Sequence, residues 1–143
     1  MTLNNLGAAY GRRAEGKTGE ARKADMARSA AYLEDYLTIA ADLGDRRGLG
    51  AAHGNLGNVY IDLGETDKAV DHLDAYVGIA AELGDKVGQG RAYSSLGFAY
   101  LPTERAKALH YWTLARDAYA EAESPDAAKM ADLVRDLDKG GGW

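Results

Sequence analysis

Two sequence markers repeat at an interval of 40 residues between residues 43 and 100, and this period constrains the fold more than any other feature. The first marker, Leu-Gly-x-x-Tyr, lies at residues 6–10, 56–60 and 96–100. The second, Leu-Gly-Asp, lies at residues 43–45 and 83–85. A fixed period of roughly 20–50 residues is typical of proteins built from stacked units, each of which buries its apolar face against the next. We therefore expect a stack of similar units.

Each unit is predicted to contain two amphipathic helices joined by a short turn. Apolar or aromatic residues recur every three or four positions over 49–63 and again over 69–83, which indicates one packed face on each helix. These residues are Leu49, Ala52, His53, Leu56, Tyr60 and Leu63, then Ala69, Val70, Leu73, Tyr76, Val77, Ala80 and Leu83. Gly64 and Gly84 are predicted to end the helices in a left-handed conformation, and such short turns make neighbouring helices antiparallel. A Gly inside a helix costs about 1 kcal/mol relative to Ala. The presence of Gly57 in a helix therefore needs a reason, and a close approach of the neighbouring helix backbone is the simplest one.

The repeat predicts a single all-α domain over residues 1–138. Its parts are a first unit at about 1–44, a second at about 45–84, a third at about 85–123 and a capping helix at about 125–138, followed by a flexible tail, 139–143. The first unit has ten residues more than the others, and we interpret them as a longer loop plus a lengthened second helix within 11–31.

The third unit and the capping helix depart from the repeat in predictable ways. Pro102-Thr103-Glu104 replaces the glycine turn, and Trp112 takes the place of Leu73. Ser124 is the predicted N-cap of the last helix, with Pro125 at its first position. One face of that helix carries Ala127, Met130, Val134 and Leu137, and its other face is charged. A polar outer face is what the end of an open stack requires.

Composition narrows the functional classes. The net charge is −5, and an acidic surface repels nucleic-acid phosphate, so we expect no nucleic-acid partner. No run of 18 apolar residues is present, so we expect no membrane partner and a cytoplasmic location. The chain has no Cys, which excludes disulfides and thiolate sites. Residues 1–31 are locally basic, which predicts a solvated face or a patch for an acidic partner.

Residues 1–123 resemble the tetratricopeptide repeat (TPR) family, through Leu-Gly-x-x-Tyr in one helix and Lys68-Ala69 in the next. The period of 40 and the sequence of residues 83–93 are similar to the subtype of the G-protein-signalling modulators, adaptors that orient mitotic spindles. This resemblance implies a right-handed superhelical stack of about three helix hairpins. In that subtype, Arg and Asn side chains on the first helix of each hairpin line a concave channel that binds an extended peptide. Arg91 and Asn58 match those residues.

Helical geometry predicts the same surface, because residues opposite the packed stripe of the first helices face outward. The predicted partner-binding residues are Asn4, Asn58, Asp62, Arg91, Ser94 and Phe98. Phe98 stands where the subtype has Asn. It either anchors a partner side chain or is covered by the next helix.

The leading hypothesis is a non-catalytic scaffold for a protein or peptide partner, with no catalytic residue, cofactor or metal. A second hypothesis is a structural or self-assembling module, monomeric or weakly oligomeric through an abruptly starting first unit. A third is a nucleotide- or small-molecule-responsive regulator, since residues 11–18 match the P-loop pattern. No β-type run exists to support that loop. His53, His72 and His110 show no metal spacing on one helix, and His53 is predicted to be a core residue.

Overall fold

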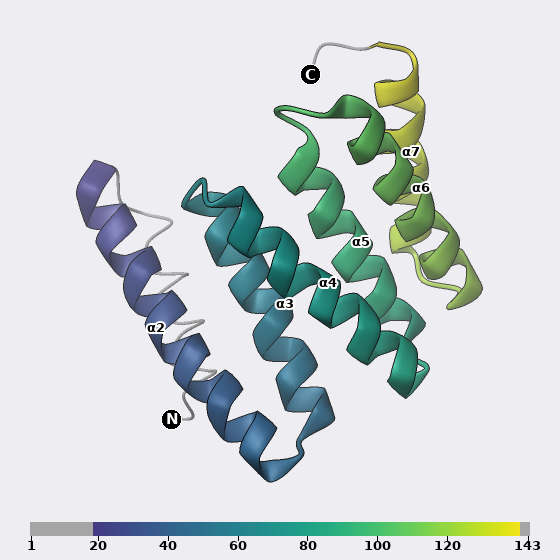
Figure 1. The fold of residues 1–143 in the computed structure, drawn as a ribbon. Coiled ribbons are helices and arrows are strands. Elements are labelled where there is room, and N and C mark those ends of the chain that lie inside the picture. The colour runs from purple at the N-terminus through teal and green to yellow at the C-terminus, as the bar shows by residue number, and fades with distance from the viewer. Residues whose placement is uncertain (1–18, 141–143) are drawn as a thin grey trace. The chain divides into compact units, whose positions relative to one another are not determined.

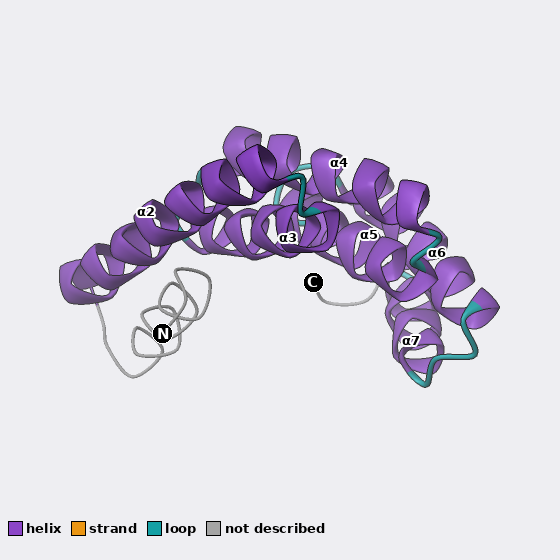
Figure 2. Cartoon of the chain, turned by 90° about the horizontal axis from the view of Figure 1, so that it is seen from below, coloured by secondary structure: helices purple, strands orange, loops and turns teal. Residues whose placement is uncertain are grey.

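The computed structural model describes residues 19–140, which form six α-helices and contain no β-strand (Figures 1 and 2). In chain order these are α2 (Gly19–Leu43), α3 (Arg46–Asp62), α4 (Thr66–Leu83), α5 (Lys86–Tyr100), α6 (Arg105–Glu121) and α7 (Asp126–Asp138). The all-α prediction is confirmed for this part of the chain. The chain divides into two units, residues 1–72 and 73–143, and the division falls within α4.

The turns that follow α2, α3 and α4 share one design. Gly44, Gly64 and Gly84 have φ of +69°, +76° and +67°, so each takes the left-handed conformation, as predicted for the last two. After α4, the N–H groups of Gly84 and Asp85 donate to carbonyl oxygens in the last turn of the helix at 3.1 and 2.8 Å. This pair of bonds is a Schellman motif, which satisfies carbonyl groups that a helix end leaves free.

An aspartate caps the start of α3 and of α5 in the same manner. Oδ1 of Asp45 accepts a hydrogen bond from the N–H of Gly48, and Oδ1 of Asp85 accepts one from the N–H of Gly88, both at 2.9 Å. Such caps satisfy an N–H group in the first turn that has no partner within the helix. The two aspartates are 40 residues apart in the sequence, so the local chemistry of the helix ends follows the sequence period.

The later turns differ, as the sequence predicts. Between α5 and α6, the N–H of Glu104 donates to the carbonyl of Tyr100 at 2.7 Å, without a left-handed glycine. Before α7, Oγ of Ser124 accepts a hydrogen bond from the N–H of Asp126 at 3.2 Å, but the N-cap residue is Pro125 and not Ser124 as predicted, and it makes no side-chain bond. The helix itself starts at Asp126, so Pro125 precedes it instead of taking its first position.

Helix α2 has 25 residues, compared with 17 in α3 and 18 in α4. This length confirms that part of the first-unit insertion extends the second helix. The predicted loop at 11–18 lies outside the described residues. Arg22, from the basic segment, pairs with Asp62 of α3 at 4.0 Å.

The core of the first unit joins α2, α3 and the start of α4. Its buried members are Met26, Ala30, Leu33, Leu56, Val59, Tyr60 and Ala69. The predicted stripe of α3 is confirmed where Ala52, Leu56 and Tyr60 are buried, while Leu49, His53 and Leu63 are partly buried. Burial of such apolar side chains is the dominant favourable contribution to folding.

In the second unit, α6 packs against both α5 and α7. The buried residues of this core are Ala108, Trp112, Ala115, Tyr119, Met130 and Leu137. Met130 and Leu137 are covered, and Ala127 and Val134 pack partly against the same core, which confirms the predicted inner face of α7. Its outer face carries ion pairs such as Arg135 to Asp132 at 3.0 Å. Lys139 and Gly140, predicted as part of the tail, donate hydrogen bonds to the end of α7 at 3.1 and 3.0 Å.

Candidate functional site

Three of the predicted partner-binding residues lie on one side of α5. Arg91, Ser94 and Phe98 are separated by three and four positions, a spacing that places side chains on the same face of a helix. Arg91 is exposed, Ser94 is partly buried, and Phe98 is 43% exposed, although it is a large apolar residue. We call these three residues the α5 face.

Trp112 of α6 supports the α5 face from beneath. It is fully buried, and its Nε1 donates a hydrogen bond to the carbonyl of Ser94 at 3.1 Å. The ring of Phe98 meets the indole edge-on, with centroids 5.0 Å apart and planes at 67°. Such aromatic pairs add about 0.5–1.5 kcal/mol beyond area burial. Phe98 is therefore covered only in part by the next helix, and its ring still presents a large exposed surface.

Glycines allow α6 to approach α5 closely. A Cβ added to Gly97 would lie 2.9 Å from Cγ of Trp112 and closer still to its Cδ1 and Nε1. A Cβ added to Gly90 would lie 2.7 Å from the ring of Tyr119. The close approach inferred from sequence for Gly57 is thus observed at Gly97, the residue 40 positions later.

The guanidinium of Arg91 lies near two phenols of the second unit, those of Tyr76 on α4 and Tyr119 on α6. Burial raises the pKa of Tyr76 above its usual value, and the positive charge of Arg91 opposes that rise. The pKa of Tyr119 is likewise raised by burial and by Asp126, against the effect of Arg91. Arg91 therefore places a positive charge at one end of the α5 face, beside the rings of Tyr76 and Tyr119.

The remaining predicted residues belong to the first unit or lie outside the described region. Asn58 and Asp62 are both exposed and share one side of α3 at a spacing of four. The carboxylate of Asp62 is engaged by Arg22 of α2 at 4.0 Å. Asn4 is not among residues 19–140. Within each unit, the described residues predicted to bind a partner are thus exposed or partly buried.

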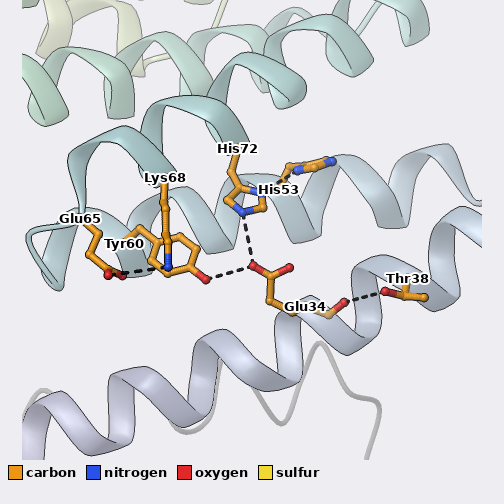
Figure 3. A network of polar contacts seen from close by, with 7 residues as sticks. All are labelled: Glu34, Thr38, His53, Tyr60, Glu65, Lys68 and His72. Atoms are coloured by element: carbon orange, nitrogen blue, oxygen red, sulfur yellow. Dashed lines mark hydrogen bonds and ion pairs between the residues drawn. The ribbon is translucent and has the colours of Figure 1, made fainter.

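Sequence reasoning missed a polar cluster that joins three helices of the first unit. Figure 3 shows Glu34 of α2, His53 and Tyr60 of α3 and His72 of α4 pointing toward one another. The Nδ1 atoms of the two histidines are 3.0 Å apart, and Nε2 of His72 lies 3.4 Å from Oε1 of Glu34. The hydroxyl of Tyr60 donates to the same Oε1 at 3.0 Å. We call these four residues the His–Glu–Tyr cluster.

Spacing within one helix cannot reveal this cluster, because its histidines are 19 residues apart and lie on different helices. His53, predicted to be a core residue with its polar atoms satisfied, has a hydrogen-bonding partner as expected but is only partly buried. The signal that could have found the pair is the turn at Gly64, because antiparallel helices bring together residues before and after their turn.

The geometry of the cluster also bears on metal binding. Within residues 19–140, no three His, Asp or Glu side chains are placed to hold a metal ion. His72 directs one ring nitrogen to His53 and the other to Glu34, so these donor atoms do not converge on one point. The P-loop-like segment, 11–18, lies outside the described residues.

The sequence matches no protein-family model, and no curated protein matches it. None of the helices between residues 19 and 140 is long and apolar enough to cross a membrane. Two features of the structure, the α5 face and the His–Glu–Tyr cluster, therefore provide the basis for inferring a function.

Proposed function

We propose that the chain is a TPR-like scaffold, built as a right-handed superhelical stack of helix hairpins, that binds a peptide or partner segment without catalysing a reaction. The recurrence of capped helix ends at the sequence period supports the repeat architecture. The aspartate caps of α3 and α5 and the glycine turns after α2 and α4 recur at 40 residues. Function in such folds depends on the particular surface presented, so the binding role has to be argued from residues.

The observation that carries the proposal is the α5 face. Phe98 exposes a large apolar ring whose orientation is restricted by its contact with Trp112. Binding an apolar side chain there would cost little conformational entropy, because the Phe98 ring is already ordered. Arg91 adds an exposed cation about 10 Å along the helix, the rise of seven residues. The favoured ligand is therefore an extended segment with one apolar side chain and one carboxylate.

A displayed library of random peptides tests this proposal even though the natural partner is unidentified. Peptides selected on the whole chain are measured by fluorescence polarisation against the wild type and against the double variant Arg91→Ala, Phe98→Ala. Removing an aromatic anchor from an interface typically weakens binding by about 2 kcal/mol or more, or about thirtyfold. We expect at least this loss for the selected peptides.

A matched control separates the α5 face from a general effect of surface change. The control variant, Leu83→Ala with Arg135→Ala, also removes one exposed apolar side chain and one exposed cation, but from α4 and α7. It should bind the selected peptides as the wild type does. Equal binding by the double variant Arg91→Ala, Phe98→Ala and the wild type would refute the assignment of the α5 face.

Self-association is the second candidate function, favoured by exposed apolar residues at the end of α2. Ile39 is 46% exposed and Leu43 is 77% exposed. Exposed apolar surface of this kind can mark a protein interface. Light scattering over a hundredfold range of concentration distinguishes the two candidates. A mass that stays monomeric throughout excludes self-association, whereas a rising mass that Leu43→Ser abolishes would establish it.

A further inference from the structure

The His–Glu–Tyr cluster holds a limited number of protons. When both histidines are neutral, Nε2–H of His72 donates to the carboxylate of Glu34, and Nδ1–H of His53 donates to the bare Nδ1 of His72. One additional proton is tolerated, because one of the two facing Nδ1 atoms can still accept. A second additional proton places N–H groups on both Nδ1 atoms, which face each other at 3.0 Å. The hydrogen bond then has no acceptor, and two cations meet.

We propose that His53 and His72 form a pH-sensitive clasp that fastens α3 to α4, and that the clasp opens when the pair takes up its second additional proton, while Glu34 of α2 keeps its contact with His72. The three helices are joined at this point by three polar contacts of 3.0–3.4 Å. Protons reach the cluster without unfolding, since the side chains of His72 and Glu34 are 17% and 43% exposed.

The surroundings of the clasp set the direction of its response. Burial lowers the pKa of His53 below its ordinary value of 6.5, and His72 lowers it further, against the opposing effect of Glu34. The charged and titratable groups that face the two rings come from all three helices and the turn before α4. They are Glu34 on α2, Arg46 and Tyr60 on α3, Glu65 in the turn and Lys68 on α4, the last two beside Tyr60.

The sign of the effect follows from this shift. Because the folded state binds the proton less readily than the unfolded chain, the unfolded chain takes up protons first as the pH falls. The contribution of the clasp to stability is complete above pH 6.5 and is lost as the pH falls below it, through the lowered pKa of His53.

The second unit contains the same arrangement without histidine. There, Tyr93 and Tyr111 stack at 6.2 Å, at the positions that correspond to His53 and His72. The surrounding frame is repeated. Tyr100 stacks on Tyr111 at 5.7 Å as Tyr60 stacks on His72 at 5.6 Å, and Lys107 covers Tyr100 at 4.8 Å as Lys68 covers Tyr60 at 5.3 Å. A phenol pair in this frame does not change charge between pH 5 and 8, so the second unit is an internal reference.

Hydrogen exchange of the full chain between pH 7.5 and 5.5 tests the proposal. Amide protection, corrected for the intrinsic effect of pH, is measured separately for α3 and for α5. In the wild type we expect protection of α3 to fall by about fivefold, the effect of losing one hydrogen bond. Protection of α5, whose unit carries only the exposed His110, should change much less.

Two variants with the same kind of substitution identify the groups responsible. The double variant His53→Tyr, His72→Tyr installs the pair that the second unit uses, and it should remove the pH-dependent loss in α3. His110→Tyr changes the remaining histidine, whose ring lies against that of Tyr111 in the second unit, and it should leave the loss intact. The proposal is overturned if the double variant keeps the loss or if His110→Tyr abolishes it.

A third variant distinguishes protonation from packing and does not depend on replacing a ring. Glu34→Gln keeps the shape of the side chain and an oxygen that can accept from Tyr60, but it removes the negative charge that favours protonation of His53. The loss of α3 protection should therefore move to lower pH. The ring signals of the three histidines, followed by NMR over the same range, report the same shift at His53. A step that stays in place or moves to higher pH would contradict the clasp.

Discussion

Replacing Gly97 with Ala should destabilise the second unit, although Ala is the better helix former. The added Cβ would lie 2.9 Å from Cγ of Trp112 and closer to Cδ1 and Nε1. Carbon atoms in favourable contact are about 3.5–4.0 Å apart, so the indole would have to move. Trp112 is fully buried, donates to the carbonyl of Ser94 and supports Phe98, so any movement disturbs several contacts.

The expected magnitude follows from two opposing effects. Overpacking a well-filled core costs about 1–3 kcal/mol, and the rigid ring and full burial of Trp112 place this case at the upper end. The higher helix propensity of Ala offsets about 1 kcal/mol of that cost. The net loss should be about 2 kcal/mol. The same substitution at Gly78 of α4, where nothing lies within 4 Å of the added Cβ, should instead stabilise by up to about 1 kcal/mol.

Urea denaturation followed by circular dichroism measures both variants. A double-mutant cycle with Trp112→Leu then isolates the contact, because the smaller side chain leaves room for the added Cβ. In that background, Gly97→Ala should cost much less than in the wild type. Equal costs in the two backgrounds, or a Gly97→Ala variant as stable as Gly78→Ala, would refute the close-approach argument.

Three further changes test the helix ends and the His–Glu–Tyr cluster. Asp85→Ala should lower the free energy of unfolding by about 1 kcal/mol in urea titrations, because it removes the side-chain N-cap of α5. Glu104→Ala should have little effect, because the side chain of Glu104 makes no capping hydrogen bond to α6. Gly84→Ala should destabilise by about 1 kcal/mol, because its φ of +67° disfavours a residue with Cβ; a variant as stable as the wild type would contradict this assignment. Burial of Tyr60 and its hydrogen bond to the Glu34 carboxylate raise the pKa of its phenol to about 12. The contribution of Tyr60 to stability should therefore be complete below pH 10 and fall as the pH rises from 10 through 12. In alkaline unfolding experiments, Tyr60→Phe should reduce that fall.

The helices and glycine turns could be predicted from the sequence because they depend on local chemistry. Gly64 and Gly84 take the left-handed conformation because neighbouring residues alone determine it, whereas Ser124 bonds to the start of α7 without being its N-cap residue. Burial is less local. Ile39 and Ile79 occupy the same position in nearly identical sequences, yet Ile39 is 46% exposed and Ile79 is 5% exposed. The surroundings of each helix decide this difference.

The candidate sites were predictable only in part, for the same reason. Helical spacing placed Arg91, Ser94 and Phe98 on one side of α5, but the contact between Phe98 and Trp112 depends on how α6 packs against Gly97. The pairing of His53 with His72 depends on the register of two antiparallel helices, which no spacing within one helix reveals.

In both units, the same set of tyrosine, lysine and glutamate residues surrounds a pair of rings, and the identity of that ring pair differs between the units. In each unit, a tyrosine of the first helix lies beneath a lysine of the second, and that lysine pairs with a glutamate three positions before it, at 3.7 and 3.5 Å. These exposed pairs contribute little energy individually, but they enclose the adjacent ring pair in the same way. The enclosed pair is the part that differs, with histidines in the first unit and tyrosines in the second. A substitution confined to the enclosed pair can therefore alter the proton response of one unit while the surrounding contacts, and the α5 face, are preserved.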